Sequence, residues 1–413
     1  MSARSALEPV TRARIGFVIE LARRLHQYGA AAPRLEQAID LVAQKLGLQC
    51  EALSTPTSTV VSFSERDGDG LAQITQVLRM APGDVNLARL CRADEIADRV
   101  IDGSMQLSDG FRELHALGRP LSRPALTAIV CAYGLAAASV AVLFGTAWVD
   151  AVAAGGIGLL IGLLSIASFG RPRLAAASEA IAALIATFIA TMVSAWIVPL
   201  ALKSVVISAL IVLVPGMTLT NAVRELSSQH LVSGVSRMAG ALATLLKLTF
   251  GTVAASQICA LLGIVPAAQP LPALPEWAQW PALLVAALSF AMLFQAAQRD
   301  YALVVVAVVL SYLVSHFGGT AFGAAFGVFL GGLLLGALGN LYARVAQRPG
   351  SLVREPGILL LVPGSVGFRS VSFLLTREVG MGAQTAILLV TLLISLVAGL
   401  LFGDLLIAPR RSL

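Results

Sequence analysis

The sequence predicts an all-α membrane protein of about ten transmembrane helices, arranged as two inverted five-helix repeats behind a small N-terminal α+β cytosolic domain. Three observations predict this class. The 413 residues are 57% hydrophobic and only 13% charged, whereas soluble domains carry roughly 25% charged residues. The charged residues are concentrated at the N-terminal end, and a motif from the middle of the chain recurs near its C-terminus.

The distribution of charge divides the chain near Leu121. Residues 1–123 hold fifteen basic and fifteen acidic side chains, and the remaining 290 residues hold fourteen and eight. We therefore expect a cytosolic domain over residues 1–120 and membrane repeats over 121–265 and 281–408. The net charge of +6 arises in the membrane half, where the rules of membrane orientation account for it. We expect no nucleic-acid partner.

The first 120 residues alternate between helical and strand-like patterns. Apolar residues recur at helical spacing on both sides of Gly29 and Pro33, which predicts two helices. Short stretches rich in β-branched residues follow, with a turn signal at 66–70 that predicts a hairpin. Two more helices are expected at about 87–101 and 107–117.

Ten apolar stretches fill the rest of the chain, each near the roughly 20 residues that cross a bilayer. The fourth and ninth are interrupted by Pro-Gly. The stretches are 125–145, 151–169, 178–198, 203–222, 236–262, 281–298, 301–317, 319–340, 356–375 and 384–407.

Basic residues in short loops predict the orientation. With the N-terminus inside, Arg171, Arg173, Arg224 and Arg299 fall in inner loops. The stretch 263–280 is rich in proline, has no basic residue and is expected outside. The sequence thus predicts a multi-pass protein of the cell inner (plasma) membrane with both termini in the cytoplasm.

An internal repeat predicts the architecture. Residues 211–216 (IVLVPG) recur 148 positions later as 359–364 (LLLVPG), and further matches at this offset include Gly234 with Gly382 and Gly251 with Gly399. Five crossings then correspond to five crossings, and an odd number inverts the second copy. Inverted repeats with broken helices at matching positions are typical of secondary transporters.

The two Pro-Gly pairs are the candidate solute site. Proline removes a backbone donor, and backbone groups freed within a membrane must line a cavity or contact protein. Pro215 with Gly216 and Pro363 with Gly364 therefore predict a polar site, with a simple packing kink as the alternative. The nearby polar residues Thr218, Asn221 and Ser365 complete this set.

Five charged residues in or beside the apolar stretches are further candidates. Glu179 and Asp404 could take up a coupling proton, although Glu179 could instead lie in interfacial water and Asp404 could pair with Arg410 or Arg411. Lys247 lies in the middle of the fifth stretch, where a charge should face protein or water. Arg224 and Arg237 could hold a carboxylate or serve only to orient the chain.

Signals of catalysis or of bound cofactors are missing from the sequence. HExxH and GxSxG motifs are absent, and the four histidines and four cysteines have no metal-ligand spacing. We expect no catalytic residue, no cofactor and no metal.

A series of short motifs runs through both parts of the chain. They are residues 25–29 (LHQYG), 34–36 (RLE), 46–48 (LGL) and 55–57 (TPT), then 214–216 (VPG), 221–222 (NA), 233–234 (SG) and Arg237. With these motifs the chain resembles the threonine/serine exporter family across nearly its whole length. The second Pro-Gly is similar to the smaller module of two-subunit relatives, here fused into one chain. The resemblance implies export of threonine and serine driven by the proton-motive force, or export of dicarboxylates such as succinate.

We therefore expect a secondary-active exporter or antiporter of small amino acids, coupled to protons. The alternatives are a dicarboxylate exporter, and an ion channel or membrane sensor. The expected partners are the small-molecule substrate, the proton and the lipid bilayer, and a homo-oligomer is left open.

Overall fold

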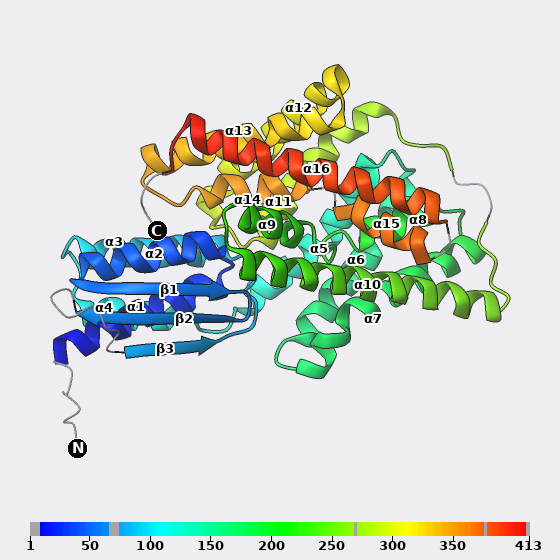
Figure 1. Cartoon of the computed structure of the whole chain (residues 1–413). Helices are drawn as coiled ribbons and strands as arrows, with labels where there is room; N and C mark the ends of the chain where they lie inside the picture. The colour runs from blue at the N-terminus through cyan, green and yellow to red at the C-terminus, as the bar shows by residue number, and fades with distance from the viewer. Residues whose placement is uncertain (1–8, 66–73, 268–270, 363, 376–377, 410–413) are drawn as a thin grey trace.

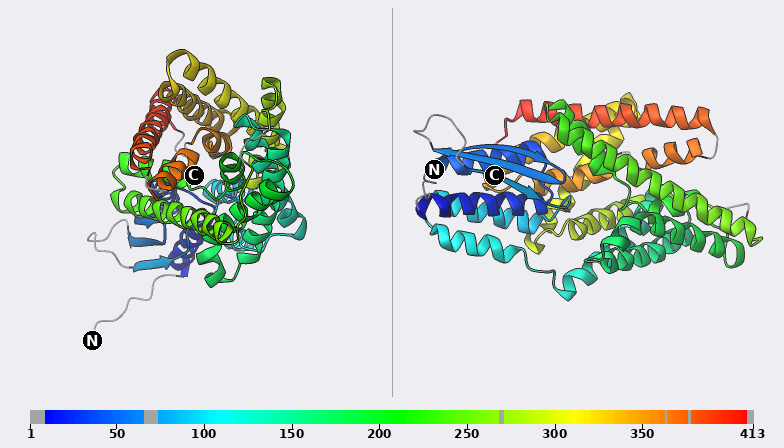
Figure 2. Two further views of the ribbon diagram at one scale, coloured as in Figure 1. Left: turned by 90° about the vertical axis from the view of Figure 1, so that its right-hand side faces the viewer. Right: turned by 60° about the horizontal axis from the view of Figure 1, so that its bottom comes forward.

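The computed structural model describes residues 9–65, 74–267, 271–362, 364–375 and 378–409. A group of helices and strands from the N-terminal third lies at one end of a larger helical bundle (Figure 1). Two further views show the long helices of the bundle running away from this group (Figure 2). The chain thus separates along its length into a mixed part and an all-helical part.

The mixed part, called the N-terminal module, consists of four helices and a three-stranded sheet. The antiparallel order is β1-β2-β3, and Leu48 pairs with Glu65 and Ser58 with Arg79. The predicted turn at 66–70 lies outside the described residues. The elements are α1 (Pro9–Gln27), α2 (Ala32–Lys45), β1 (Leu48–Thr55), β2 (Ser58–Glu65), β3 (Ile74–Arg79), α3 (Leu87–Ile101) and α4 (Leu107–Leu117).

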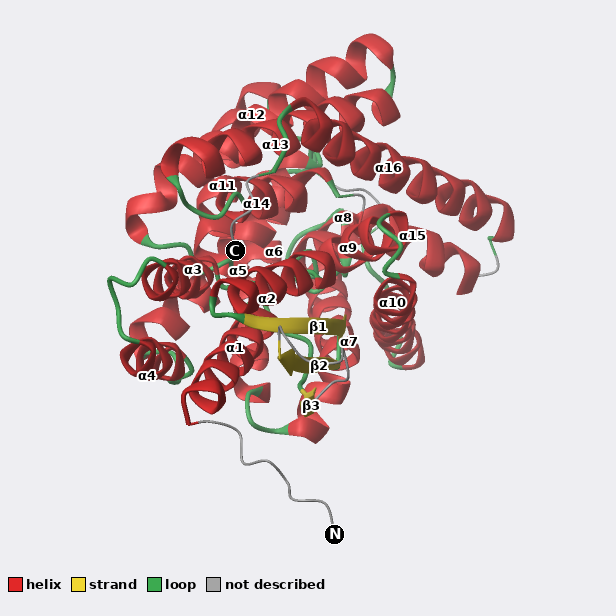
Figure 3. Ribbon diagram, turned by 60° about the vertical axis from the view of Figure 1, so that its left-hand side comes forward, coloured by secondary structure: helices red, strands yellow, loops and turns green. Residues whose placement is uncertain are grey.

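The module has its own apolar core. Phe17 and Leu21 of α1 pack with Leu35 of α2 and Phe63 of β2, and all four are at most 2% exposed. The turn between α1 and α2 requires Gly29, whose φ is +80° and whose position leaves no room for a Cβ beside Val85. Figure 3 shows α1 and α2 beside the sheet, with α3 and α4 next to them.

The helical part runs from Arg123 to Leu406. The first half comprises α5 (Arg123–Leu143), α6 (Trp148–Ser168), α7 (Pro172–Trp196), α8 (Leu202–Ala209), α9 (Gly216–Ser227) and α10 (Leu231–Leu261). The second half comprises α11 (Gln279–Leu293), α12 (Tyr301–Phe322), α13 (Ala324–Ala346), α14 (Ser351–Leu361), α15 (Gly364–Leu375) and α16 (Val379–Leu406). Short 3₁₀ turns, η1 (Glu276–Ala278) and η2 (Gln298–Asp300), precede α11 and α12.

Within the described ranges, nine stretches are long and apolar enough to cross a membrane. The fourth of the ten expected crossings is missing from this set because residues 210–215 separate its two short helices, α8 and α9. Many large apolar side chains on the bundle face outward, including Leu163, Phe250, Phe322 and Leu405, which are 55–79% exposed. Apolar patches of this extent require a nonaqueous environment, so the chain is a multi-pass membrane protein.

Corresponding helices of the two halves make corresponding contacts. α5 packs on α6 as α11 packs on α12, and α7 packs on α10 as α13 packs on α16. In the second pair of contacts a glycine permits the close approach. A Cβ on Gly251 of α10 would overlap the carbonyl oxygen of Ala180, and one on Gly399 of α16 would overlap that of Phe329. These are the glycines that match at the offset of 148 residues.

The ends of several bundle helices meet the N-terminal module, and we call this the module end of the bundle. The amides of Leu87 and Ala88 donate to the carbonyl oxygens of Phe294 and Gln295, between α11 and α12, at 2.9 and 3.1 Å. Other module contacts involve the segment between α9 and α10, described next. The sequence predicts that all of these segments lie on the inner side of the membrane.

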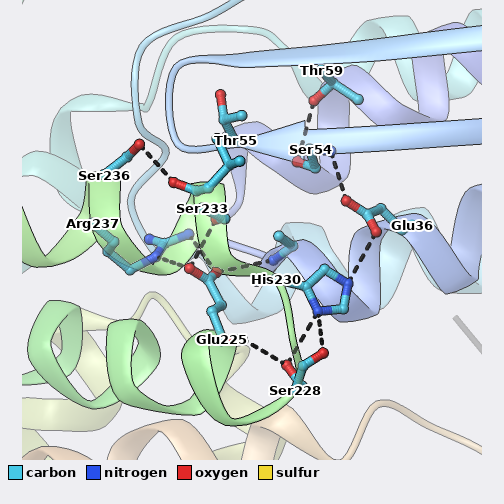
Figure 4. A network of polar contacts seen from close by, with 12 residues as sticks. Glu36, Ser54, Thr55, Thr59, Glu225, Ser228, His230, Ser233, Ser236 and Arg237 are labelled. Atoms are coloured by element: carbon cyan, nitrogen blue, oxygen red, sulfur yellow. Dashed lines mark hydrogen bonds and ion pairs between the residues drawn. The ribbon is translucent and has the colours of Figure 1, made fainter.

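A buried carboxylate fastens the module to the first half (Figure 4). Glu225 of α9 has no exposed side-chain surface and accepts two bonds of 3.0 Å from the guanidinium of Arg237. It also accepts from the hydroxyl of Ser233 at 2.8 Å and from the amide of Ala32 at 3.2 Å. Ala32 is the first residue of α2, and the N-cap residue of that helix, Ala31, has no polar side chain with which to cap it. Glu225 therefore supplies the negative charge that a helix N-terminus favours.

A second contact follows one turn later in the chain. The His230 ring places Nε2 3.0 Å from a carboxylate oxygen of Glu36, and its Nδ1 lies 2.9 Å from the carbonyl oxygen of Ser228. The other carboxylate oxygen of Glu36 accepts from the amide of Ser54 at 2.7 Å. The ring of His230 therefore bridges Glu36 of α2 and Ser228, the residue after α9.

We predict that Glu225→Ala loosens the module. Removing one partner of a buried ion pair leaves the other charge unpaired, which typically costs about 3–5 kcal/mol. Hydrogen exchange in the full-length protein should then accelerate at the Ala32 amide and the first turn of α2. Glu276→Ala, at an exposed acid outside this network, is the control and should leave exchange unchanged. The double variant with Arg237→Ala should be less destabilised than the sum of the two single variants, and strict additivity would contradict the assignment.

Candidate functional site

Both Pro-Gly motifs interrupt their crossings. In the first half α8 ends at Ala209, and α9 begins at Gly216 with Pro215 as its N-cap. Between them the Gly216 amide donates to the carbonyl of Val214 at 2.7 Å, a tight turn outside either helix. In the second half α14 ends at Leu361 and α15 begins at Gly364. Pro363 itself lies outside the described residues.

The two breaks contact each other. A Cβ added to Gly216 would lie 2.5 Å from Cγ1 of Val362, and one added to Gly364 would lie 2.8 Å from Cγ1 of Val214 and 3.2 Å from the Cα of Gly216. Neither glycine has a positive φ, so glycine is required here for space and not for backbone conformation. The structure therefore brings the paired motifs together, as a closed contact rather than an open gap.

Two helix N-termini converge where the two breaks meet, because α9 and α15 both begin there. We call this contact between the two breaks the crossing. The first amides of a helix have no partner within it, and its dipole favours negative charge at that end. The hydroxyl of Thr220 donates a hydrogen bond to the carbonyl oxygen of Gly216 at 3.2 Å. Asn221 is 8% exposed, and Thr218 and Ser365 are half-buried. A solute carboxylate fits the charge at this position.

A cavity of about 230 Å³ lies between the N-terminal module and the module ends of α9, α13, α14 and α16, and we call it the interface cavity. Of the predicted site residues it contains Arg224 and Asp404, and not the Pro-Gly motifs. Arg224 follows Gly216 by eight residues on α9, so about 12 Å along the helix axis separates the cavity from the crossing. Its charged lining residues are Arg34, Asp94, Arg224, Arg354, Glu355 and Asp404.

Asp404 has defined partners. It accepts from Arg354 at 2.9 Å and from the side-chain amide of Asn340 at 2.7 Å, and Arg354 also contacts the Asn340 oxygen. The alternative partners Arg410 and Arg411 lie outside the described residues. Within the described ranges no group of three or more His, Cys, Asp or Glu side chains could hold a metal ion.

Glu179 and Lys247 form an ion pair of 2.9 Å, and Lys247 also donates to the carbonyl of Ala176 at 3.4 Å. Glu179 lies in the second turn of α7. Lys247 therefore has an anionic partner on α7 and faces protein at this point. The ion pair and the hydrogen bond of these two residues join α7 to α10 and do not involve the Pro-Gly motifs.

Sequence reasoning missed most of the buried acids. Arg237 was singled out, but its partner Glu225 was not, and neither were the cavity residues Glu355 and Ser351. Arg34 was noted only among the residues that carry the family resemblance. The scarcity of acidic residues could have pointed to these acids, because the 290 residues after Arg123 contain only eight acidic side chains. Several of those eight are almost fully buried and hydrogen-bonded, including Glu225 and Asp150.

Among curated proteins the chain is similar to fungal membrane proteins. It is 26% identical to "Pheromone-regulated membrane protein 10" of Eremothecium gossypii over 368 residues, which are 86% of this chain and 48% of that protein. It is also 26% identical to the protein of the same name from Candida albicans, over 86% of this chain and 33% of that protein. The chain thus spans less than half the length of these relatives. No solved structure matches it.

Two family models match the chain in sequence. The model described as "Putative threonine/serine exporter" matches residues 16–259, which include the N-terminal module and most of the first half. The model described as "Threonine/Serine exporter, ThrE" matches residues 280–406, the second half. The chain therefore belongs to the threonine/serine exporter family, with both parts fused in one polypeptide.

Proposed function

We propose that this protein is a secondary-active exporter of small amino acids of the threonine and serine class, coupled to protons and located in the cell inner membrane. The contact between Gly216 and Gly364 carries the proposal, since it joins the two interrupted crossings at one point. Broken helices that meet between two halves are the usual setting of a transported solute. The family assignment independently supports export.

We also propose that residues 121–265 and 281–408 are inverted repeats preceded by a domain of residues 1–120. Two aspartates at equivalent places support this. Asp150, in the first turn of α6, accepts from the amide of Ala201 just before α8, at 2.8 Å. Asp300, just before α12, accepts from Arg348 shortly before α14, at 2.5 and 2.8 Å. In each half, an aspartate at the start of the second helix therefore accepts a hydrogen bond from the segment just before the fourth helix.

Alternating access would then consist of opening and closing this crossing. The crossing is closed by van der Waals contact, while the interface cavity lies on the module side of it. A solute leaving the cytosol would pass from the cavity to the crossing once the breaks separate. Its carboxylate would meet the amides of α9 and α15, with Thr218, Asn221 and Ser365 as neighbouring polar groups.

A dicarboxylate such as succinate is the second candidate solute. It is favoured by the three guanidinium groups of Arg34, Arg224 and Arg354 on one cavity. Cells and proteoliposomes supplied with either class of solute would distinguish the two.

The first prediction tests the crossing. Gly216→Ala places a methyl group against Val362, so transport in proteoliposomes should fall at least about tenfold, the effect of about 1.4 kcal/mol. Val362→Ala removes the atom that the new methyl would meet, so the double variant should recover. Gly240→Ala, at a helical glycine with open space around it, is the matched control. Normal transport by Gly216→Ala, or loss without rescue, would contradict the assignment.

The second prediction concerns proton coupling. Glu179 and Asp404 each pair with a cation, and protonation would release that cation. Glu179→Gln or Asp404→Asn should therefore abolish uphill export while exchange of solute across the membrane continues. Full pH-dependent export by both variants would assign coupling to another group.

The third prediction concerns orientation. In a background without Cys131, which is exposed, Glu276→Cys should react with a membrane-impermeant thiol reagent added outside intact cells. Arg173→Cys, in the segment before α7, should react only after the membrane is opened. The reverse pattern would overturn the proposed topology.

A further inference from the structure

We propose that the interface cavity is a binding site for the carboxylate of a small solute, completed by Arg34 of the N-terminal module together with Arg224 of the first half. This deepens the proposed function and rests on it, because it assigns the first solute site on the path to the crossing. It also gives the soluble module a direct part in recognising the solute.

The location of the two arginines is the first argument. Arg34 lies in the first turn of α2, and Arg224 lies in α9, one residue before the Glu225 that fastens α2 to the bundle. The hydrogen bond from the Ala32 amide to Glu225 thus holds both guanidinium groups at the same cavity. Neither the module nor the bundle alone contains the pair.

Electrostatics gives the second argument. Burial lowers the pKa of the Arg34 guanidinium, Asp94 and Glu355 oppose this shift by attraction, and Arg224 adds to it by repulsion. The repulsion between Arg34 and Arg224 is the part of this balance that a bound anion would relieve. Guanidinium groups are the preferred partners of carboxylates because their planar forks match the two oxygens.

Unsatisfied polar atoms give the third argument. Ser351 lines the cavity and is 3% exposed, and its hydroxyl has no hydrogen-bond partner among the described residues. Oε2 of Glu355, on the next turn of α14, is also buried without a partner in the described part of the chain. A buried polar atom without a partner is costly. A polar solute would supply the missing bonds, to a hydroxyl donor and to a carboxylate acceptor.

The size and charge of the cavity restrict the solute. The cavity volume of about 230 Å³ lies just below the roughly 300–1,000 Å³ of pockets for drug-sized ligands, so a small organic acid suits it. The carboxylates of Asp94 and Glu355 lie in the same lining. An ammonium group on the same solute would therefore have anionic neighbours in the site.

The test is equilibrium binding to purified full-length protein, measured by calorimetry with L-threonine, L-serine, succinate and threoninol. Threoninol carries a hydroxymethyl group in place of the carboxylate. We expect at least one of the three carboxylates to bind and threoninol not to bind. Arg34→Gln and Arg224→Gln should each weaken binding about ten- to a hundredfold, because each removes a charge-assisted bond.

Matched variants control for charge and folding. Arg12→Gln changes an exposed arginine of the module, and Arg173→Gln changes an exposed arginine of the bundle. Both should bind as the unmodified protein does. Thermal unfolding of every variant identifies loss of structure, and Arg224→Gln tests the site independently of the fold of the module.

The outcomes separate this inference from the exporter function. Unchanged affinity in Arg34→Gln and Arg224→Gln overturns the cavity site, and normal transport by the same variants leaves the exporter function standing. No binding of any carboxylate by the unmodified protein also overturns the site. Arginine-dependent binding without transport of any solute in proteoliposomes keeps the site and overturns the exporter function.

Discussion

A bilayer core offers no hydrogen-bond partners to an interrupted backbone, and this constraint determines the arrangement of the bundle. The chain interrupts two crossings and places the interruptions against each other, away from lipid. Glycine at 216 and 364 lets the two backbones approach, and the side chains of Val362 and Val214 pack against these glycines. The other helices of each half surround its broken pair, and the tight contacts at Gly251 and Gly399 hold that frame together.

The acidic residues of the membrane half serve the same frame. Glu225, Asp150 and Asp300 are at most 3% exposed, and each has its oxygens occupied by backbone amides, a hydroxyl or a guanidinium. Charges buried in this way stabilise a structure only while every partner is present. The interface cavity differs, because buried atoms of Ser351 and Glu355 there lack partners among the described residues. That difference separates a structural carboxylate from a group that is available to a solute.

The sequence predicted the class and the main elements, for reasons that particular residues make clear. The length of the apolar stretches indicated the membrane crossings, and the repeated Pro-Gly pairs indicated the two breaks. Both signals can be recognised from neighbouring residues alone. The spacing of Leu35 and Ile39 with their neighbours predicted α2 for the same reason. The cavity could not be predicted, because Arg34 and Arg224 are 190 residues apart and meet only when the module docks. The ion pair of Lys247 could not be predicted either, because Glu179 lies 68 residues earlier in the chain and meets Lys247 only where α7 packs on α10.

The module bonds to both halves of the bundle at once. Glu225 and His230 hold it to the first half, and Phe294 and Gln295 hold it to the second. Two bodies joined by a common third body cannot rotate against each other unless one joint yields. If the halves rotate against each other in the proposed transport cycle, the free energy of breaking the weaker joint would add to the activation barrier of that cycle. Changes that strengthen docking would lower the turnover rate without altering a residue that touches the solute, and changes that weaken it would raise the rate until another step becomes limiting.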